Sequence, residues 1–135
     1  MKIRPILARL NTSGVFKTVR FSRDLPELKS FKPEELPAVY LLPSSVRGGV
    51  EGGDISLQQE AIEVYSFAVI TKAPTADGTD EPLDEALSEL RRLMFGFQPD
   101  PHVAPFAIGE GDLIDFNPSV NAWLETFVTR RTYRS

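Results

Sequence analysis

The chain contains no cysteine and only one histidine, and these shortages limit the chemistry that it can carry out. Without cysteine it cannot form a disulfide, a thiolate nucleophile or a zinc-thiolate site, which favours a cytoplasmic product. His102, in "PDPHVAP", has neither a second histidine nor a convincing nucleophile nearby in the sequence. Because general base catalysis needs such a partner, a partly exposed loop residue is the favoured interpretation of His102.

Long apolar runs are missing as well. The apolar stretches "AVYLLP" and "FAVI" are far shorter than the roughly 20 residues that a membrane-spanning helix needs. The N-terminal "MKIRPILARLNTSG" interleaves basic and apolar residues, whereas a signal peptide separates a basic start from a continuous apolar run. We therefore expect neither a membrane span nor export.

A strong charge of one sign is also absent. The 135 residues are 41% hydrophobic and 25% charged, with a net charge of −4. This size and composition predict a single domain over residues 1–135 with a real core. The acidic balance argues against general affinity for nucleic acid, although a local basic patch is compatible with it.

Two apolar stripes with helical spacing predict two helices. The first predicted helix lies near the N-terminus and is ended by Gly14. The second follows the acidic stretch "TDEP". The members of the two stripes are Ile3, Ile6, Leu7 and Leu10, and then Leu83, Leu87, Leu90 and Met94. The second helix has Thr79 or Asp80 as an N-cap and Arg91 and Arg92 near its end, which suits the helix dipole.

The stretch "MFGFQPDPHVAP" marks the end of the second helix. Gly96 follows the last apolar helix residue, where a left-handed conformation is favoured. The prolines beyond it prevent the helix from resuming. Phe95 and Phe97 are expected to seal this helix end against the sheet, because aromatic side chains bury large apolar areas.

Alternating apolar residues predict the strands of a sheet. The longest segment, "QQEAIEVYSFAVITK", has one face that holds Glu63, Tyr65, Phe67 and Val69. The other segments are "GVFKTVRF", "AVYLL" ending at Pro43, two short strands around a Gly-Glu-Gly turn in "PFAIGEGDLIDFNP", and the C-terminal "VNAWLETFVTRRTYR". This order predicts an α+β domain with a mixed, largely antiparallel β-sheet and helices packed on one face.

Two loops containing glycine and proline are predicted between these elements. Residues 43–57, "PSSVRGGVEGGDISL", show no sustained period and indicate a long flexible connection, and residues 73–82 form the second loop. A phosphate-binding P-loop needs a lysine and a hydroxyl residue directly after its last glycine. The run "GGVEGGD" has neither, so a flexible loop is favoured over a nucleotide site.

Two charged clusters are compatible either with ligand binding or with a purely structural role. In "GEGDLIDFN" the carboxylates of Glu110, Asp112 and Asp115 are ligands that suit calcium or magnesium, but their spacing is not that of an EF-hand, and a solvated turn is favoured. The C-terminal "TRRTYRS" can contact phosphates, yet in an acidic chain ion pairs at the surface or between subunits are favoured. The residues alone indicate no active site, metal or cofactor.

Several segments together resemble the tail terminator family of long-tailed bacteriophages, which includes the minor tail protein U type. They are an N-terminal helix ending in a polar turn, "LPAVYLLP", "QQEAIEVYSFAVI", "LSELRRLMFGFQP" and the terminal "FAIGEGDLIDFNPSVNAWLETFVTRR". The resemblance covers nearly the whole chain, so it implies one tail-terminator-like α+β domain over residues 1–135.

The resemblance implies a structural virion protein that is not an enzyme and needs no cofactor. In this family a ring, usually of about six copies, caps the growing tail tube, stops its polymerisation and presents a surface to the head connector. The implied partners are further copies of the chain, the tail tube protein and the head-tail connector protein. DNA would pass through the lumen without specific binding. The protein would be made in the bacterial host cytoplasm and located at the head-proximal end of the tail.

We expect the loops and the C-terminal arginines to supply the contacts of such a ring, although the loops can equally be inert connections. An acidic lumen would repel the DNA phosphates, and its expected contributors are Glu51, Asp54, Asp77, Asp80, Glu81 and Asp84. The C-terminal arginines would pair with acids of an adjacent subunit. The expected interface residues are Arg47, Val50, Glu51, Asp54, Asp77, Asp80, Arg130, Arg131 and Arg134.

Two other functional classes stay open. Another head-tail joining or tail completion protein would share the small α+β build, and its position in the particle would separate it from a terminator. A small-ligand-binding enzyme would require a deep pocket with converging polar groups.

Overall fold

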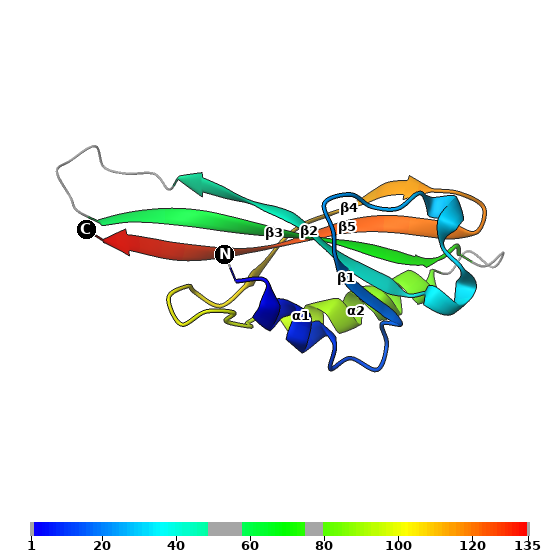
Figure 1. The fold of residues 1–135 in the computed structure, drawn as a ribbon, viewed down its shortest axis with the longest axis horizontal. Helices are drawn as coiled ribbons and strands as arrows, with labels where there is room; N and C mark the ends of the chain where they lie inside the picture. The colour runs from blue at the N-terminus through cyan, green and yellow to red at the C-terminus, as the bar shows by residue number, and fades with distance from the viewer. Residues whose placement is uncertain (1, 49–57, 75–79, 135) are drawn as a thin grey trace.

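A five-stranded sheet forms the body of the computed structural model, which describes residues 2–48, 58–74 and 80–134 (Figure 1). The strands are β1 (Thr18–Phe21), β2 (Ala38–Gly48), β3 (Gln58–Lys72), β4 (Ala107–Phe116) and β5 (Val120–Arg134), in the spatial order β1-β2-β3-β5-β4. Only β1 and β2 run parallel; the other three pairs are antiparallel. The prediction of a mixed, largely antiparallel α+β sheet is confirmed.

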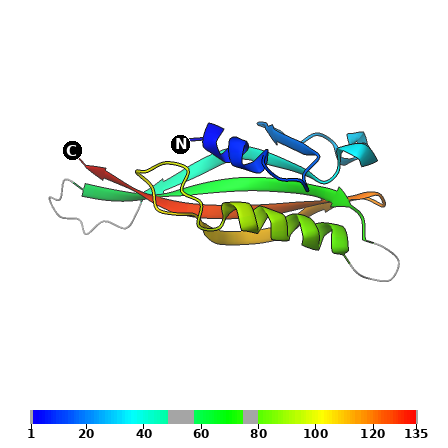
Figure 2. The same ribbon diagram turned by 90° about the horizontal axis from the view of Figure 1, so that it is seen from below.

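Both α-helices cover the same face of this sheet. Helices α1 (Arg4–Leu10) and α2 (Glu81–Met94) lie side by side on it in Figure 2. Two short 3-10 turns, η1 (Leu28–Ser30) and η2 (Pro33–Glu35), pack against one end of the reverse face. The face that carries α1 and α2 is called the helix face below.

The main core lies between the helix face and the two helices. It contains Ile6 and Leu10 of α1, the apolar stripe of α2, and the inward side chains of β2, β3 and β5. Aromatic rings fill its centre, with the Phe67 and Phe127 rings 5.6 Å apart and the Tyr65 and Phe106 rings 5.0 Å apart. The alternation of β3 therefore places its residues on the faces that the sequence predicts.

The second helix ends as predicted, at a glycine with positive φ. Gly96 has φ of 79°, and Phe97 packs against the core with its ring 6.4 Å from that of Phe106. The prediction for Phe95 is wrong, because its side chain points to solvent and is 62% exposed. The left-handed conformation of Gly96, between the two phenylalanines, sends their side chains in different directions, so only Phe97 faces the core.

Replacing Gly96 with alanine is expected to lower the free energy of unfolding by about 1–2 kcal/mol, because a Cβ is disfavoured at this φ. Gly14→Ala is the matched control: no atom lies within 4 Å of a Cβ built there, and its φ is not positive. That change should be neutral or stabilise by up to about 1 kcal/mol. Equal losses in urea unfolding of the two variants would contradict the role of the left-handed residue.

Two strands differ from their predicted extent. β2 continues through Pro43 to Gly48, with an irregularity between Leu42 and Ser45 that accommodates the proline. Residues 43–48 are therefore strand and not loop, and the rest of that predicted loop lies outside the described residues. β4 is one strand and not two, because register shifts absorb the Gly-Glu-Gly segment without reversing the chain.

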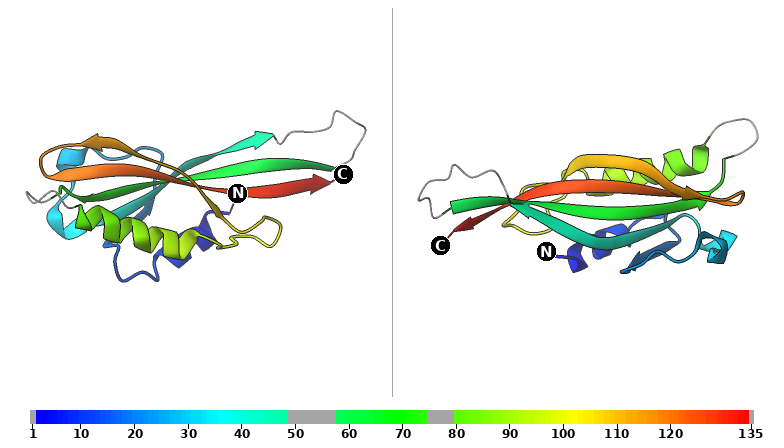
Figure 3. Two further views of the ribbon diagram at one scale, coloured as in Figure 1. Left: turned by 180° about the vertical axis from the view of Figure 1, so that it is seen from behind. Right: turned by 90° about the horizontal axis from the view of Figure 1, so that it is seen from above.

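One end of the sheet projects beyond both helices (Figures 1 and 3). It is built from the end of β2, the start of β3 and the end of β5, with Gln58 paired to Arg134 and Ile62 to Arg130 and Arg47. We call this three-stranded projection the arm.

Candidate assembly surfaces

The described residues contain no group of three or more histidine, cysteine, aspartate or glutamate side chains that could hold a metal ion. Glu110, Asp112 and Asp115 thus do not converge on a cation site, and they lie on a strand and not in the turn that their sequence favours. Among the described residues, no helix is both long enough and apolar enough to cross a membrane.

Strand β4 is the outermost strand on one side of the sheet. All ten of its residues are exposed, and no strand of the described chain pairs with its outer side. Its exposed apolar side chains are Ile108, Leu113, Ile114 and Phe116. A long unpaired edge with apolar side chains is a place where another chain can add a strand.

The two faces of β4 differ in character. Leu113 is paired with Trp123, whose side chain packs against the core, so Leu113 lies on the helix face. Asp112 is paired with Leu124 and lies on the reverse face. Residues 107–116 include three carboxylates and no basic side chain. This edge is apolar toward the helix face and acidic toward the reverse face.

Strand β1 forms the opposite edge of the sheet (Figure 3). Its segment carries the opposite charge. Phe21 is paired with Leu41 of the core and lies on the helix face, 48% exposed. Arg20 is paired with Tyr40 on the reverse face. The segment 15–23 holds three exposed basic residues, Lys17, Arg20 and Arg23, and no acid. None of these three bases has an ion-pair partner among the described residues.

A buried ion-pair cluster lies at the base of the arm. Arg131 Nε donates to Glu63 Oε2 at 2.7 Å, and Arg131 Nη2 donates to Asp100 Oδ2 at 3.0 Å. The Tyr65 hydroxyl donates to Glu63 Oε1 at 3.1 Å. The hydrogen bond that Arg131 donates to Glu63 raises the pKa of Arg131, and burial raises the pKa of the Tyr65 phenol, with the Glu63 charge adding to that rise. The cluster fastens the segment before β4 to the centre of the sheet.

The predicted interface residues differ in where the structure places them. The side chain of Arg131 is 15% exposed and already paired within the chain, whereas that of Arg130 is 68% exposed, with its Nη1 4.0 Å from Glu60. Asp80 is the N-cap residue of α2, as predicted, but its side chain makes no capping hydrogen bond; it is partly buried and accepts a hydrogen bond from Asn121 Nδ2 at 3.4 Å. Arg47 and Arg134 lie in the strands of the arm, and Val50, Glu51, Asp54 and Asp77 lie outside the described residues. An interface role for these residues stays a prediction.

A second buried carboxylate, Glu125, lies under α2. It accepts hydrogen bonds from Trp123 Nε1 at 3.0 Å and from the Arg91 guanidinium, whose Nη2 lies at 3.1 Å. Gly111 of β4 is opposite, where a Cβ would lie only 2.5 Å from Glu125 Oε1. Because Gly111 has no Cβ, β4 can lie close to the Glu125 carboxylate, which in turn accepts a hydrogen bond from Arg91 of α2.

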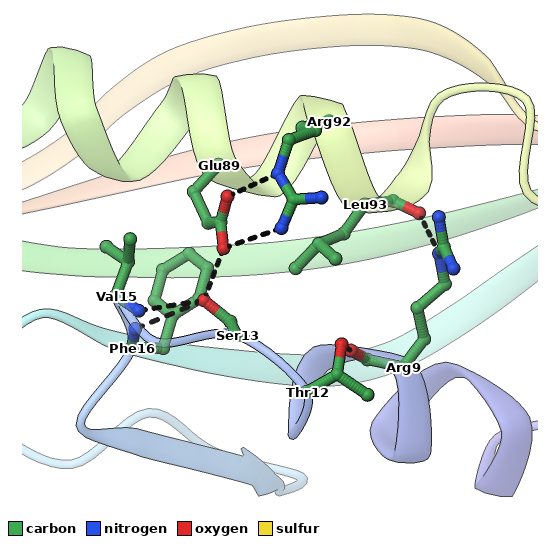
Figure 4. A network of polar contacts seen from close by, with 8 residues as sticks. All are labelled: Arg9, Thr12, Ser13, Val15, Phe16, Glu89, Arg92 and Leu93. Carbon is green, nitrogen blue, oxygen red and sulfur yellow. Dashed lines mark hydrogen bonds and ion pairs between the residues drawn. The ribbon is translucent and has the colours of Figure 1, made fainter.

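A polar network joins the turn after α1 to α2 (Figure 4). Ser13 Oγ donates to Glu89 Oε2 at 2.6 Å, and Arg92 Nε donates to Glu89 Oε1 at 2.7 Å. Arg9 Nε of α1 donates to the carbonyl of Leu93 near the end of α2. The Arg92 guanidinium and then the Ser13 hydroxyl hold the pKa of Glu89 below its usual range. These contacts fix the helix layer, and with it the position of β1.

The fold is expected to lose stability as the pH falls through the acidic range. The His102 amide and then the Arg131 guanidinium lower the pKa of Asp100, as Arg92 and Ser13 lower that of Glu89. A folded pKa below the unfolded value gives stability that is present above the unfolded pKa and lost as the pH falls through the folded pKa. The melting temperature should therefore drop from about pH 4.5 downward. A double variant, Asp100→Asn with Glu89→Gln, should show a smaller fall in melting temperature with pH. An unchanged dependence of the melting temperature on pH would contradict the role of these two carboxylates.

One of the comparisons with known proteins shows a family for this chain. A family model described as "Phage tail terminator protein" matches residues 1–135. Among solved structures, a chain of the "Virion of native gene transfer agent (GTA) particle" aligns with a TM-score of 0.58 and 11% identity, covering 93% of this chain and 90% of that one. At that identity the likeness shows a shared fold. A search of curated proteins gives no significant match.

Proposed function

The chain belongs to the phage tail terminator family, and from that membership we propose that it caps the tail tube, ends its polymerisation and presents the surface to which the head connector binds. The family match over residues 1–135 is the observation that carries this proposal. The role is structural and not enzymatic. Its place is the head-proximal end of the tail in the virion.

A ring, of about six copies, suits this task because it presents one face to the tube and the other to the connector. Contacts between different patches of identical subunits close into a ring when the rotation between neighbours divides the circle. The sheet offers two different edges for such contacts, β1 and β4.

The lumen of the ring is proposed to be acidic, so that DNA passes without binding. Among the described residues, the expected contributors Glu81 and Asp84 are exposed in the first turn of α2, whereas Asp80 is partly buried. The other expected contributors, Glu51, Asp54 and Asp77, lie outside the described residues. The exposed Arg130 stays a candidate for a contact between subunits.

Native mass spectrometry over a concentration series, with negative-stain imaging of the same sample, tests this proposal. A closed ring of about six copies that binds one end of purified tail tubes is the expected result. A protein that neither closes into a ring nor binds tube ends would contradict it. Binding elsewhere in the particle would instead indicate another head-tail joining or tail completion protein.

A further inference from the structure

We propose that neighbouring subunits join through strand edges, with β4 of one subunit lying against β1 of the next, so that one sheet continues around the ring. This inference rests on the proposed ring function and adds which surfaces form its contacts. β1 and β4 are at opposite ends of the strand order, so each subunit presents one of each. A head-to-tail contact of this kind closes on itself without leaving either edge open.

The charges of the two edges favour a second copy of the chain as the occupant. The β1 segment has three exposed basic side chains, and β4 has three exposed carboxylates, Glu110, Asp112 and Asp115. None of the six has an ion-pair partner among the described residues. A foreign partner would match only one of these edges, whereas a copy of the same chain matches both. Complementary charge of this kind also selects the correct pairing over β1 with β1 or β4 with β4.

The faces of the two edges agree as well. Rotation about a ring axis keeps the helix face of every subunit on the same side of the continued sheet. On that face Phe21 would meet the apolar side chains of Leu113 and Phe116, which border a groove of about 430 Å³ that Leu83 and Trp123 also line. On the reverse face the Arg20 guanidinium would meet the Asp112 carboxylate. Apolar contacts and ion pairs therefore fall on opposite faces of the same junction.

Backbone pairing supplies the remaining contact. β1 has four residues and β4 has ten, so the shorter strand sets the length of the new ladder. An added strand gains affinity from main-chain hydrogen bonds and specificity from the side chains beside them. Because the ladder is short, the charged and aromatic side chains decide whether the junction forms.

Charge reversal with rescue by mixing tests this arrangement. Arg20→Asp places an acid on both sides of the proposed Arg20–Asp112 contact, and Asp112→Arg places a base on both sides, so each variant alone should need at least about ten-fold more protein to assemble. A mixture of the two should assemble again, because at each contact a base then meets an acid. Native mass spectra of the mixture should show rings with equal numbers of the two subunits, which requires an even ring size. The double variant in one chain should also recover assembly.

Two controls separate this effect from a general change of charge. Arg4→Asp and Glu85→Arg make the same charge changes at exposed positions on the helices and not on a strand edge. Both should assemble like the unchanged chain. Since the chain has no cysteine, Arg20→Cys with Asp112→Cys introduces the only thiols, and a short bis-maleimide should link successive subunits into a covalent series that ends at the ring size.

Rings that form equally well from either reversal variant alone would overturn the edge contact and leave the proposed function standing. A chain that stays monomeric at about 1 mM and gives no cross-linked series would also overturn it, because complementary edges should associate at that concentration. In that case the proposed function is decided separately, by whether the monomer binds the end of a tail tube.

Discussion

Replacing Arg131 with methionine is expected to lower the free energy of unfolding by about 3–5 kcal/mol, because it leaves two buried carboxylates without their cation. The side chains of Glu63 and Asp100 are 1% and 3% exposed, so water cannot take over the solvation that the guanidinium provides. Methionine keeps most of the aliphatic length, so the loss reflects charge and hydrogen bonding more than packing.

The adjacent arginine gives the matched control. Arg130 lies on the same strand, but it is 68% exposed and its distance to the Glu60 carboxylate is 4.0 Å. Arg130→Met should change the free energy of unfolding by less than about 1 kcal/mol. Urea unfolding of both variants at neutral pH, at a concentration where the chain is monomeric, measures the difference. Equal effects would show that the internal cluster contributes little.

The pH dependence of the Arg131→Met variant provides a second readout. Without the guanidinium, the variant holds two buried carboxylate charges that have lost their cation. Acid that neutralises these charges removes the penalty of burying them unpaired. The deficit of the variant should therefore shrink as the pH falls, and a deficit that grew would point to lost packing instead.

This internal role also changes how an arginine contact between subunits should be tested. The sequence groups Arg130, Arg131 and Arg134 as one basic patch, but alternation along β5 separates the first two onto opposite faces. A charge reversal at Arg131 would place a third carboxylate beside Glu63 and Asp100 and unfold the chain before any contact could be judged. Only the exposed Arg130 is suitable for that experiment.

The elements with a long regular pattern could be predicted from the sequence, and those with interrupted patterns could not. β3 has the predicted bounds because fifteen alternating residues leave one register that buries Tyr65, Phe67 and Val69. The sequence predicts that β2 ends at Pro43, because a proline normally ends a strand, whereas in the structure a register shift accommodates this proline. The turn predicted within β4 failed for the same reason, since a bulge uses the same glycines as a turn.

The candidate surfaces depend on strand order, which no local pattern reveals. The three bases of residues 15–23 and the three acids of residues 107–116 are visible in the sequence, but nothing there shows that they occupy opposite edges of one sheet. The buried carboxylates, in contrast, can be recognised in the sequence by their neighbours. Glu63 lies between Ala61 and Tyr65 on its strand face and Glu125 between Trp123 and Phe127, and a carboxylate among such neighbours requires a partner. The partners are 68 and 34 residues away and could not be identified from the chain alone.

Two phenylalanine-to-alanine replacements should separate the residues that hold the fold from those that hold the ring. Phe127 is fully buried, with its ring 5.6 Å from that of Phe67 and 6.1 Å from that of Phe106. Phe127→Ala should lower the free energy of unfolding by about 3–5 kcal/mol, because the cavity at the centre of the core cannot close. This loss is a large part of the stability of an ordinary domain.

Phe116 is the opposite case, since it is 68% exposed on β4 and contributes little to the core. Phe116→Ala should leave urea unfolding of the monomer within about 0.5 kcal/mol of the unchanged chain. It should nevertheless raise the concentration at which rings form, because the side chain lies on the face of β4 where Phe21 of the next subunit is proposed to pack. A Phe116→Ala variant that unfolds early would assign this side chain to the fold, and one that assembles normally would remove it from the junction. Loss of assembly with unchanged unfolding is the result that the exposed edge predicts.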